Sequence, residues 1–365
     1  MVDLVVFENT SEFNYQWDNC EILKVKSASG EYKVSFLDET HDFDRFIRDL
    51  NAVRKKDHLI FIVDECLKKH LNILNRPVLY LEANEEQKSY DGVGKVIEKL
   101  LEMGVTKDTH IVAIGGGVIQ DTASFVASIL FRGISWSFYP STLLAQGDSC
   151  IGSKTSINFK KHKNQLGNFY PAESVWIHTK FLESLPELQI YSGLGEMLHY
   201  FFVASDERVE FFSKNIDNLK NLIRSALYIK SAYIEVDEFD KKERRVFNYG
   251  HSFGHALESV LSYEIPHGLA VCYGMDMANY VSMKFGYISK EQYNKYNSVL
   301  YRIYSKYELP DFDIGEFEKA LKRDKKNKDD EYGLILTKGA GNMFLDYVKM
   351  NGDLMVFIKE WKEKL

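Results

Sequence analysis

Apolar and polar residues follow different periods in the two halves of the chain. In the first half, short continuous apolar runs, typical of buried strands, are separated by stretches with helical spacing. The predicted strands are HLIFIVDE (58–65), PVLYLEA (77–83), HIVAIGGG (110–117) and ISWSFYP (134–140), and a long amphipathic helix is predicted from about Ser89 to Met103. Strands that alternate with helices predict a parallel, doubly wound sheet.

A hairpin is predicted ahead of this sheet. Residues 20–37 read CEILKVKSASGEYKVSFL, in which apolar and polar positions alternate on both sides of Ser29-Gly30. Alternation of period two around a turn pair is typical of two antiparallel strands. The pattern assigns no chemistry to this hairpin.

The second half of the chain has a different hydrophobic pattern. From about Phe181, apolar residues recur every three or four positions, and strand patterns return only in YGLILTK and MFLDYVK near the end. This spacing predicts a mainly helical domain. We therefore expect an α/β domain over 1–180, with the hairpin as an extension, and a helical domain over 181–365. A ligand site is expected in the cleft between two such halves.

Composition narrows the class of protein. The 365 residues carry a formal net charge of −7, with 45% hydrophobic and 27% charged residues, which excludes a disordered chain and argues against nucleic acid as the partner. No apolar run approaches the roughly 18 residues of a membrane span, and the start lacks signal-peptide features, so we expect a cytoplasmic protein without a membrane partner. The cysteines lack CxxC spacing and are expected to be buried apolar residues rather than disulfide or zinc ligands; they are Cys20, Cys66, Cys150 and Cys272.

Three consecutive glycines, Gly115, Gly116 and Gly117, lie between a predicted strand and a predicted helix. Glycine lets the backbone approach a pyrophosphate closely, and the N-terminus of the following helix offers free N–H groups and a partial positive charge. The arrangement favours a dinucleotide site. Because the spacing is not GxGxxG, a tight turn without a ligand stays open as the alternative.

Ionisable residues on three predicted helices form a second candidate site. His251 and His255 lie one turn apart on the same helix, Glu196 lies on an earlier helix, and His267 begins another after a proline. Nitrogen and oxygen ligands from three helices, with one position left open, are typical of a catalytic zinc site. Since the pattern lacks the glutamate of HExxH, core or surface histidines remain the alternative at this point.

The polar stretch GDSCIGSKTSINFKKHKNQLGNFYP (147–171) carries a third set of candidates. In a turn, Asp148, Lys154, Lys163 and Asn164 have the charges and amide groups to bind an anionic, polyhydroxylated substrate. A solvated basic loop is an equally good interpretation of the same residues.

Seven ordered blocks of the sequence resemble a known family. They are GGGVIQD, RG, STLLAQGDSCIGSKTSIN, KNQLGNFYP, SGLGEMLHY, RRVFNYGHSFGHALE and HGLAVCYGM. In order and spacing they resemble the dehydroquinate synthase family, the sugar phosphate cyclases, from about His58 to the C-terminus; the first 57 or so residues match poorly. The resemblance implies a Rossmann-like α/β NAD-binding domain followed by a mainly α-helical metal-binding domain.

The resemblance also implies two cofactors. Zinc, which cobalt can replace at such a site, would be held by Glu196, His251 and His267. The pyrophosphate and nicotinamide of NAD would lie near Gly115, Gly116, Gly117, Asp121, Ser141 and Thr142. The adenosine end would lie near Asp64, Glu85 and Lys88, and Asp148 and Lys163 are further cofactor-binding positions.

A sugar phosphate is the substrate that the resemblance implies. The family's catalytic positions match Asp148, Lys154, Lys230, Asn248 and His255, the last on the phosphate side. Its other substrate-binding positions match Arg132, Lys163, Asn164, His199, Arg244 and Lys325, with Lys326 as the alternative to Lys325. Arg132 resembles an arginine that reaches the phosphate site of a neighbouring subunit, which implies a homodimer.

The implied reaction runs through several steps on one sugar phosphate. NAD takes hydride from an alcohol, phosphate leaves by elimination, hydride returns, and the opened ring closes to a carbocycle. Arg244 and Asn248 match a pair that the family uses near a substrate carboxylate. This favours a carbon–oxygen lyase that converts 3-deoxy-D-arabino-heptulosonate 7-phosphate to 3-dehydroquinate and phosphate.

The chain also departs from the family's usual residues. His199 replaces a lysine, and milder changes occur at Cys66, Gln120, Ser141 and Ser153. A related cyclase for sedoheptulose 7-phosphate or a hexose phosphate therefore stays open. The phosphate-binding residues argue against a metal-dependent alcohol dehydrogenase of the glycerol dehydrogenase type, and the intact metal triad argues against a binding paralogue without activity.

Overall fold

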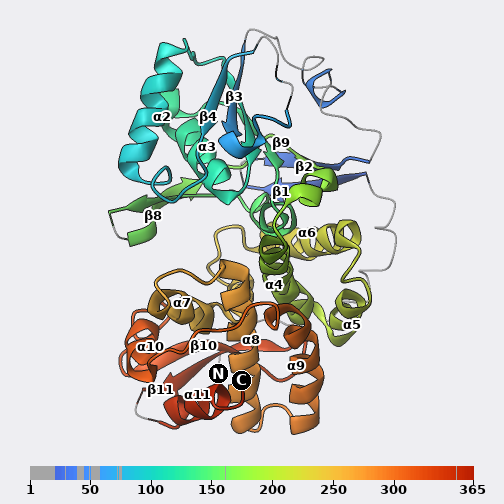
Figure 1. The fold of residues 1–365 in the computed structure, drawn as a ribbon, viewed down its shortest axis with the longest axis vertical. Helices are drawn as coiled ribbons and strands as arrows, with labels where there is room; N and C mark the ends of the chain where they lie inside the picture. The colour runs from blue at the N-terminus through green and yellow to red at the C-terminus, as the bar shows by residue number, and fades with distance from the viewer. Residues whose placement is uncertain are drawn as a thin grey trace. The chain divides into compact units, whose positions relative to one another are not determined.

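The computed structural model describes residues 21–28, 30–38, 45–48, 50, 58–71, 73, 76–160, 162–350 and 352–365. These residues form two compact units, coloured mainly blue to green and olive to red in Figure 1. The sheet unit extends to Leu185 and includes Lys230–Phe239, and the helical unit comprises Pro186–Ile229 and Asp240–Leu365. The sequence predicts a contiguous division at 180/181, whereas these units divide after Leu185 and 230–239 groups with the sheet unit.

A seven-stranded sheet in the order β1-β2-β9-β6-β5-β3-β4 forms the centre of the sheet unit. Its strands are β1 (Ile22–Ser27), β2 (Gly30–Phe36), β3 (Leu59–Asp64), β4 (Val78–Leu81), β5 (His110–Gly115), β6 (Trp136–Pro140) and β9 (Ser174–Ile177). Only β1 and β2 pair antiparallel; all other neighbours are parallel. The predicted parallel sheet and hairpin are confirmed, although Cys20 and Ser29 lie outside the described residues.

The strands of this sheet are buried as their apolar runs predict. Every residue of β3 and β5 is buried, as expected for parallel strands covered on both faces. The predicted helix over 89–103 is α2 (Tyr90–Glu102), which begins where the Ser89 hydroxyl accepts a hydrogen bond of 3.0 Å from the Gly92 N–H. Helix α3 (Gly117–Ile129) packs on β3, β5 and β6.

The polar stretch after β6 forms a second hairpin rather than a simple turn. A single π-helical turn (Ala145–Ser149) leads into β7 (Lys154–Phe159), which pairs antiparallel with β8 (His162–Phe169). No residue of β8 is buried, so its sequence carries no alternation of apolar and polar residues. The hairpin was therefore not visible in the hydrophobic pattern.

The second unit is mainly helical, as predicted. Its elements are α4 (Glu187–Ala204), α5 (Asp206–Lys214), the first part of α6 (Leu219–Val236), α7 (His251–Val260), α8 (His267–Lys284), α9 (Lys290–Tyr304), α10 (Ile314–Leu321), α11 (Leu354–Lys362) and the pair β10 (Glu331–Thr337) and β11 (Met343–Lys349). Helix α8 is buried along most of its length and contacts α4, α7, α9 and α11 (Figure 1).

The sequence-based expectations about membrane spans and about cysteine burial can be compared with the described residues. None of its described helices has both the length and the apolar content needed to cross a membrane. Cys150 and Cys272 are buried as expected, but Cys66 is exposed, because it lies in a short turn beyond the end of β3.

Candidate metal centre and nucleotide-binding residues

Three candidate metal ligands converge in the helical unit. Glu196 lies within α4, and His251 and His267 are the first residues of α7 and α8. Nε2 of His251 lies 3.3 Å from Oε1 of Glu196, and Nε2 of His267 lies 3.4 Å from Oε2. One donor atom of each residue lies within 4.8 Å of the others, a spacing that allows all three to contact one cation.

Glycines let the three helices approach closely enough to bring these ligands together. A Cβ on Gly268 would lie 1.8 Å from the carbonyl oxygen of Ser192 in α4, and a Cβ on Gly274 would lie 2.0 Å from that of Gly250. Gly195, beside Glu196, has the same constraint against Gly268, at 2.3 Å. Any side chain at these positions would push the helices apart.

The protonation of both histidines suits metal binding. Nδ1 of His267 lies 3.2 Å from a carboxylate oxygen of Glu258, and Nδ1 of His251 lies 3.3 Å from the carbonyl oxygen of Tyr249. Each acceptor requires the ring proton on Nδ1, which leaves the lone pair on Nε2, the nitrogen that faces Glu196. The sequence analysis missed Glu258, although it lies two helical turns after His251 on the same face of α7.

The carboxylate of Glu196 also fits a cation. Burial by itself raises the pKa of Glu196, but without a metal the His251 and His267 rings, when protonated, outweigh burial and hold the pKa below its usual range. Among the described residues, Oε2 of Glu196 accepts no hydrogen bond although it is buried. A buried anionic oxygen of this kind is a suitable ligand for a divalent cation.

His199 packs beside this cluster. Its side chain is 1% exposed, and Nδ1 donates to the backbone carbonyl of Glu196 in the same helix. The ring lies 3.9 Å from that of Tyr200 and 5.3 Å from that of His251, measured between centroids. The expected contact of His199 with a substrate stays a prediction.

His255 lies against the cluster without belonging to the Glu196 triad. Its ring is stacked on that of His267, at 5.6 Å between centroids. Desolvation lowers the pKa of His255, although only in part because the side chain is exposed. The charges of His251, His267 and Lys326 lower this pKa further. Lys326, whose charge acts on His255, is held by an ion pair of 2.8 Å with Asp324, whereas Lys325 is exposed.

The two residues expected at a substrate carboxylate lie on one short helical turn, Glu243–Asn248. Arg244 is buried, and the amide of Asn248 donates to the carbonyl of Arg245 at 3.1 Å. Phe247 of the same turn packs edge-to-face on the His199 ring, 5.7 Å between centroids. This contact places the turn beside the metal-ligand cluster.

The three glycines of the sheet unit differ in what surrounds them. Gly115 ends β5, Gly116 precedes α3, and a Cβ on either would lie within 2.8 Å of a side chain, Ile119 or Thr142. Gly117 begins α3 and faces open space. Packing therefore requires the first two glycines, and the third leaves the N-terminus of α3 open to a ligand.

Residues expected around the nucleotide are linked to one another and to Asn164, which was expected at the substrate. Lys88 forms a 2.7 Å ion pair with Asp121 and donates to the amide oxygen of Asn164, also at 2.7 Å. Burial raises the pKa of Asp121, and the Lys88 charge opposes this shift. Asn158, which the sequence analysis missed, donates to Glu85 at 2.5 Å and accepts from the Asn164 N–H at 2.9 Å.

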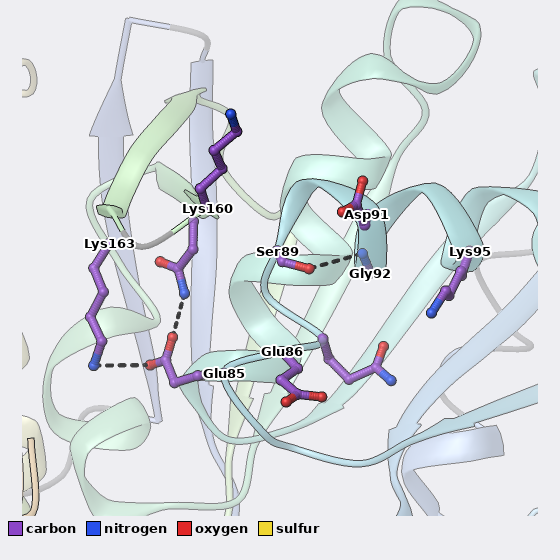
Figure 2. A pocket seen from close by; sticks show the side chains of 10 residues that line it. Glu85, Glu86, Ser89, Asp91, Gly92, Lys95, Lys160 and Lys163 are labelled. Carbon is purple, nitrogen blue, oxygen red and sulfur yellow. Dashed lines mark hydrogen bonds and ion pairs between the residues drawn. The ribbon is translucent and has the colours of Figure 1, made fainter.

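A groove of about 500 Å³ lies beside Glu85 at the start of α2. Figure 2 shows Lys163 reaching toward the Glu85 carboxylate, a separation of 3.9 Å, with Lys160 on the same side and Ser89 capping the helix. The groove is lined by both acidic and basic side chains. The groove thus lies next to Glu85, a residue expected at the adenosine end of a dinucleotide.

The remaining predicted residues are distributed over the sheet unit. Lys230 donates to the carboxylate and to the carbonyl of Asp148, both at 2.7 Å, and so joins segment 230–239 to this unit. Lys154 is exposed at the start of β7, and the Ser141 N–H donates to Gly115. Asp64 accepts from the Cys66 N–H at 3.1 Å, and Arg132 is exposed with a φ of 69°.

The fold and the site define a class of protein. One unit is an α/β sheet with a glycine-rich turn at the carboxyl end of its parallel strands, and the other is helical and carries a candidate metal centre of one Glu and two His residues. Residues 78–192 match the family 3-dehydroquinate synthase N-terminal, and residues 193–327 match 3-dehydroquinate synthase C-terminal. The chain therefore belongs to the 3-dehydroquinate synthase family.

Individual relatives agree with this assignment. A 3-dehydroquinate synthase of Alkaliphilus metalliredigens (strain QYMF) is 33% identical over 306 residues, 79% of this chain and 85% of that protein. One of Campylobacter concisus (strain 13826) is 33% identical over 356 residues, 93% and 99% of the two chains. The chain is accordingly an enzyme, a 3-dehydroquinate synthase-like cyclase.

A solved structure shows the same fold. The crystal structure of 2-deoxy-scyllo-inosose synthase complexed with carbaglucose-6-phosphate, NAD+ and Co2+ matches with a TM-score of 0.79. It is 24% identical and covers 93% of this chain and 98% of that chain. The predicted α/β and helical architecture is therefore confirmed.

Proposed function

We propose that this enzyme converts 3-deoxy-D-arabino-heptulosonate 7-phosphate to 3-dehydroquinate and phosphate, as a carbon–oxygen lyase that uses NAD and zinc. The observation that carries the proposal is the buried Arg244 on a turn that packs beside the Glu196–His251–His267 cluster. A guanidinium binds a carboxylate through two parallel hydrogen bonds, so a keto acid suits this position.

The metal ligands in this proposal are Glu196, His251 and His267. Bound there, a divalent cation makes a secondary alcohol easier to deprotonate. Glu258 and the Tyr249 carbonyl keep the ligand nitrogens in the required tautomer. The donor set of one carboxylate and two imidazoles suits zinc, and cobalt suits it as well.

We assign nucleotide binding to the sheet unit. The open N-terminus of α3 at Gly117 suits the NAD pyrophosphate, and Glu85 suits a ribose diol. Bound there, NAD would supply reversible hydride-transfer chemistry. Lys88 pairs with Asp121 and also holds the Asn164 amide in position.

The remaining side chains bind and orient the sugar phosphate. Lys230, held by Asp148, and Lys154 are assigned to charge that develops on the substrate, where a preorganised donor contributes about 3–4 kcal/mol. His255 and Lys326 form the phosphate end, and Lys326 takes the place expected for Lys325. We further propose that Arg132, exposed in a left-handed conformation, reaches a second copy of the chain in a homodimer.

A second candidate function is cyclisation of a sugar phosphate without a carboxylate. The observation in its favour is His199, which is bonded to its own helix and buried, at a position where the family's lysine would contact the substrate. The fold is shared with 2-deoxy-scyllo-inosose synthase, whose structure holds carbaglucose-6-phosphate. Arg244 favours the keto acid over this alternative.

Phosphate release by the NAD- and zinc-loaded enzyme tests the proposal. Offered the heptulosonate phosphate, sedoheptulose 7-phosphate and glucose 6-phosphate separately, the enzyme should release phosphate from the first without accumulating NADH. Arg244→Lys should lower kcat/KM for the keto acid about 10- to 100-fold, because the bidentate pair is lost. Arg245→Lys, one residue further on, is the matched control and should change it little. Phosphate from a neutral sugar alone would reject the keto acid and support the second candidate.

A further inference from the structure

Two consecutive residues with left-handed backbone conformation directly precede Lys154. Gly152 has a φ of 103° and Ser153 a φ of 64°. Glycine adopts such angles freely, but Ser153 carries a Cβ and is buried, so its conformation must be held by its neighbours. Because the turn sets the direction in which the chain enters β7, it sets the direction of Lys154.

Hydrogen bonds from distant parts of the sheet unit hold this turn. The hydroxyl of Ser153 donates to Oε1 of Glu238 at 2.6 Å, and both side chains are buried. The N–H of Gly152 donates to the hydroxyl of Tyr32 in β2 at 3.0 Å. The carbonyl of Ser153 accepts from the Tyr170 N–H at 2.6 Å. These bonds favour the left-handed conformation over an extended one.

The N-terminal hairpin contributes to the same arrangement. The second oxygen of the Glu238 carboxylate accepts from the N–H of Ala28, in the turn between β1 and β2, at 2.5 Å. Glu238 thus joins the hairpin, the segment after α6 and the turn before Lys154. A buried carboxylate bonded on both oxygens is a stiff connection, because breaking either bond leaves a buried charge without its donor.

We propose that Tyr32, the Ala28 N–H and Glu238 form a brace that fixes the turn Gly152–Ser153 and so directs Lys154 toward the substrate. This gives the hairpin a part in the reaction, which its sequence pattern did not indicate. Tyr32 and Glu238 are positioning residues, since they act through Lys154. This inference depends on the proposed function in one respect only, the assignment of Lys154 to the substrate.

Two substitutions at one position separate positioning from stability. Ser153→Ala keeps the Cβ but removes the hydroxyl, and should raise KM for the heptulosonate phosphate about tenfold, because a small displacement of a binding group is costly. Ser153→Gly adopts the left-handed conformation without help and should remain close to the wild type. Glu238→Gln should behave like Ser153→Ala, and adding Ser153→Gly to it should restore most of the loss.

A second readout does not depend on turnover. The rate at which acetic anhydride labels Lys154, measured by peptide mass spectrometry, should change several-fold in Ser153→Ala, Glu238→Gln and Tyr32→Phe. It should not change in Ser153→Gly. Exposed residues of the same unit provide matched controls, Tyr90→Phe and Glu102→Gln, and both should match the wild type.

The two readouts distinguish failure of this inference from failure of the proposed function. If Ser153→Ala and Ser153→Gly give the same KM and the same labelling rate, the brace does not position Lys154 and the inference is wrong. If the wild type releases no phosphate from any of the three sugar phosphates, the proposed function fails, and the labelling rates alone then decide whether the brace exists.

Discussion

Glu258 sets the tautomer of His267, and one proton decides whether that ring can hold a cation. Its carboxylate lies 3.2 Å from Nδ1, so the proton stays there and Nε2 keeps its lone pair. A carboxylate behind a ligand histidine also makes the imidazole more basic. Glu258 thus acts on the metal centre through His267, the ligand that it contacts.

Glu258→Gln should therefore weaken zinc binding about 10- to 100-fold, as the loss of a carboxylate behind a ligand histidine typically does. Competition of the purified protein with a chromogenic chelator gives the zinc affinity, and the visible spectrum of the cobalt form reports the ligand geometry. Glu264→Gln removes the same charge from an exposed residue close to His267 and is the matched control. Equal zinc affinities of the two variants would contradict the role given to Glu258.

At the scale of the elements, close backbone contact between α4, α7 and α8 builds the cluster. Each helix supplies one ligand, and Gly195, Gly268 and Gly274 lie where the backbones meet. The conformational cost of glycine in a helix, about 0.5–1 kcal/mol relative to alanine, is offset by this packing. The cluster therefore depends on residues that bear no functional group.

Gly274→Ala tests this dependence away from the ligands themselves. The added methyl would meet the Gly250 carbonyl at 2.0 Å, so α7 and α8 must separate, at a cost of about 1–3 kcal/mol in the free energy of unfolding. Zinc affinity should fall as well, since Gly250 directly precedes His251. Gly94→Ala in α2, where a Cβ meets no atom within 4 Å, should instead raise stability by about 0.5–1 kcal/mol. Urea unfolding of both variants, followed by circular dichroism, checks the opposite signs.

At the scale of the whole molecule, the two candidate ligand sets lie in different units. The glycine turn and its charged partners belong to the sheet unit, and the Glu–His–His cluster belongs to the helical unit. A ligand stabilises the structure that it binds, by about 2.7 kcal/mol at a concentration of 100 times its Kd. Each cofactor should accordingly protect its own unit.

Hydrogen exchange followed by mass spectrometry checks this expectation. Zinc added to the chelated protein should slow exchange in α4, α7 and α8, and NAD should slow it between β5 and α3. Glucose, which lacks both a phosphate and a nucleotide, should slow neither and serves as the control. Protection of the β5–α3 turn by zinc alone would show that the ligand sets are wrongly divided between the units.

The candidate ligand set could be read from the sequence, but its supporting residues could not. Blocks such as NYGHSFGHALE and HGLAVCYGM carry the family pattern, so Glu196, His251 and His267 were identified before the structure placed them together. Glu258 and Asn158 bond partners 9 and 73 residues away in the chain, respectively. No local pattern identifies such partners.

The sequence by itself determined the elements whose periodicity reflects burial. Continuous apolar runs became β3 and β5, alternation became the hairpin β1–β2, and three-to-four spacing became the helical unit, because each pattern matches one repeating geometry of the backbone. Only the tertiary structure decided the hairpin β7–β8, whose second strand has no buried residue, and the transfer of 230–239 to the sheet unit. The exposed strand β8 lacks the burial that would leave a hydrophobic pattern. The placement of 230–239 depends on contacts between segments far apart in the chain, such as Lys230 with Asp148, whose energy is set by distance in space rather than by order in the sequence.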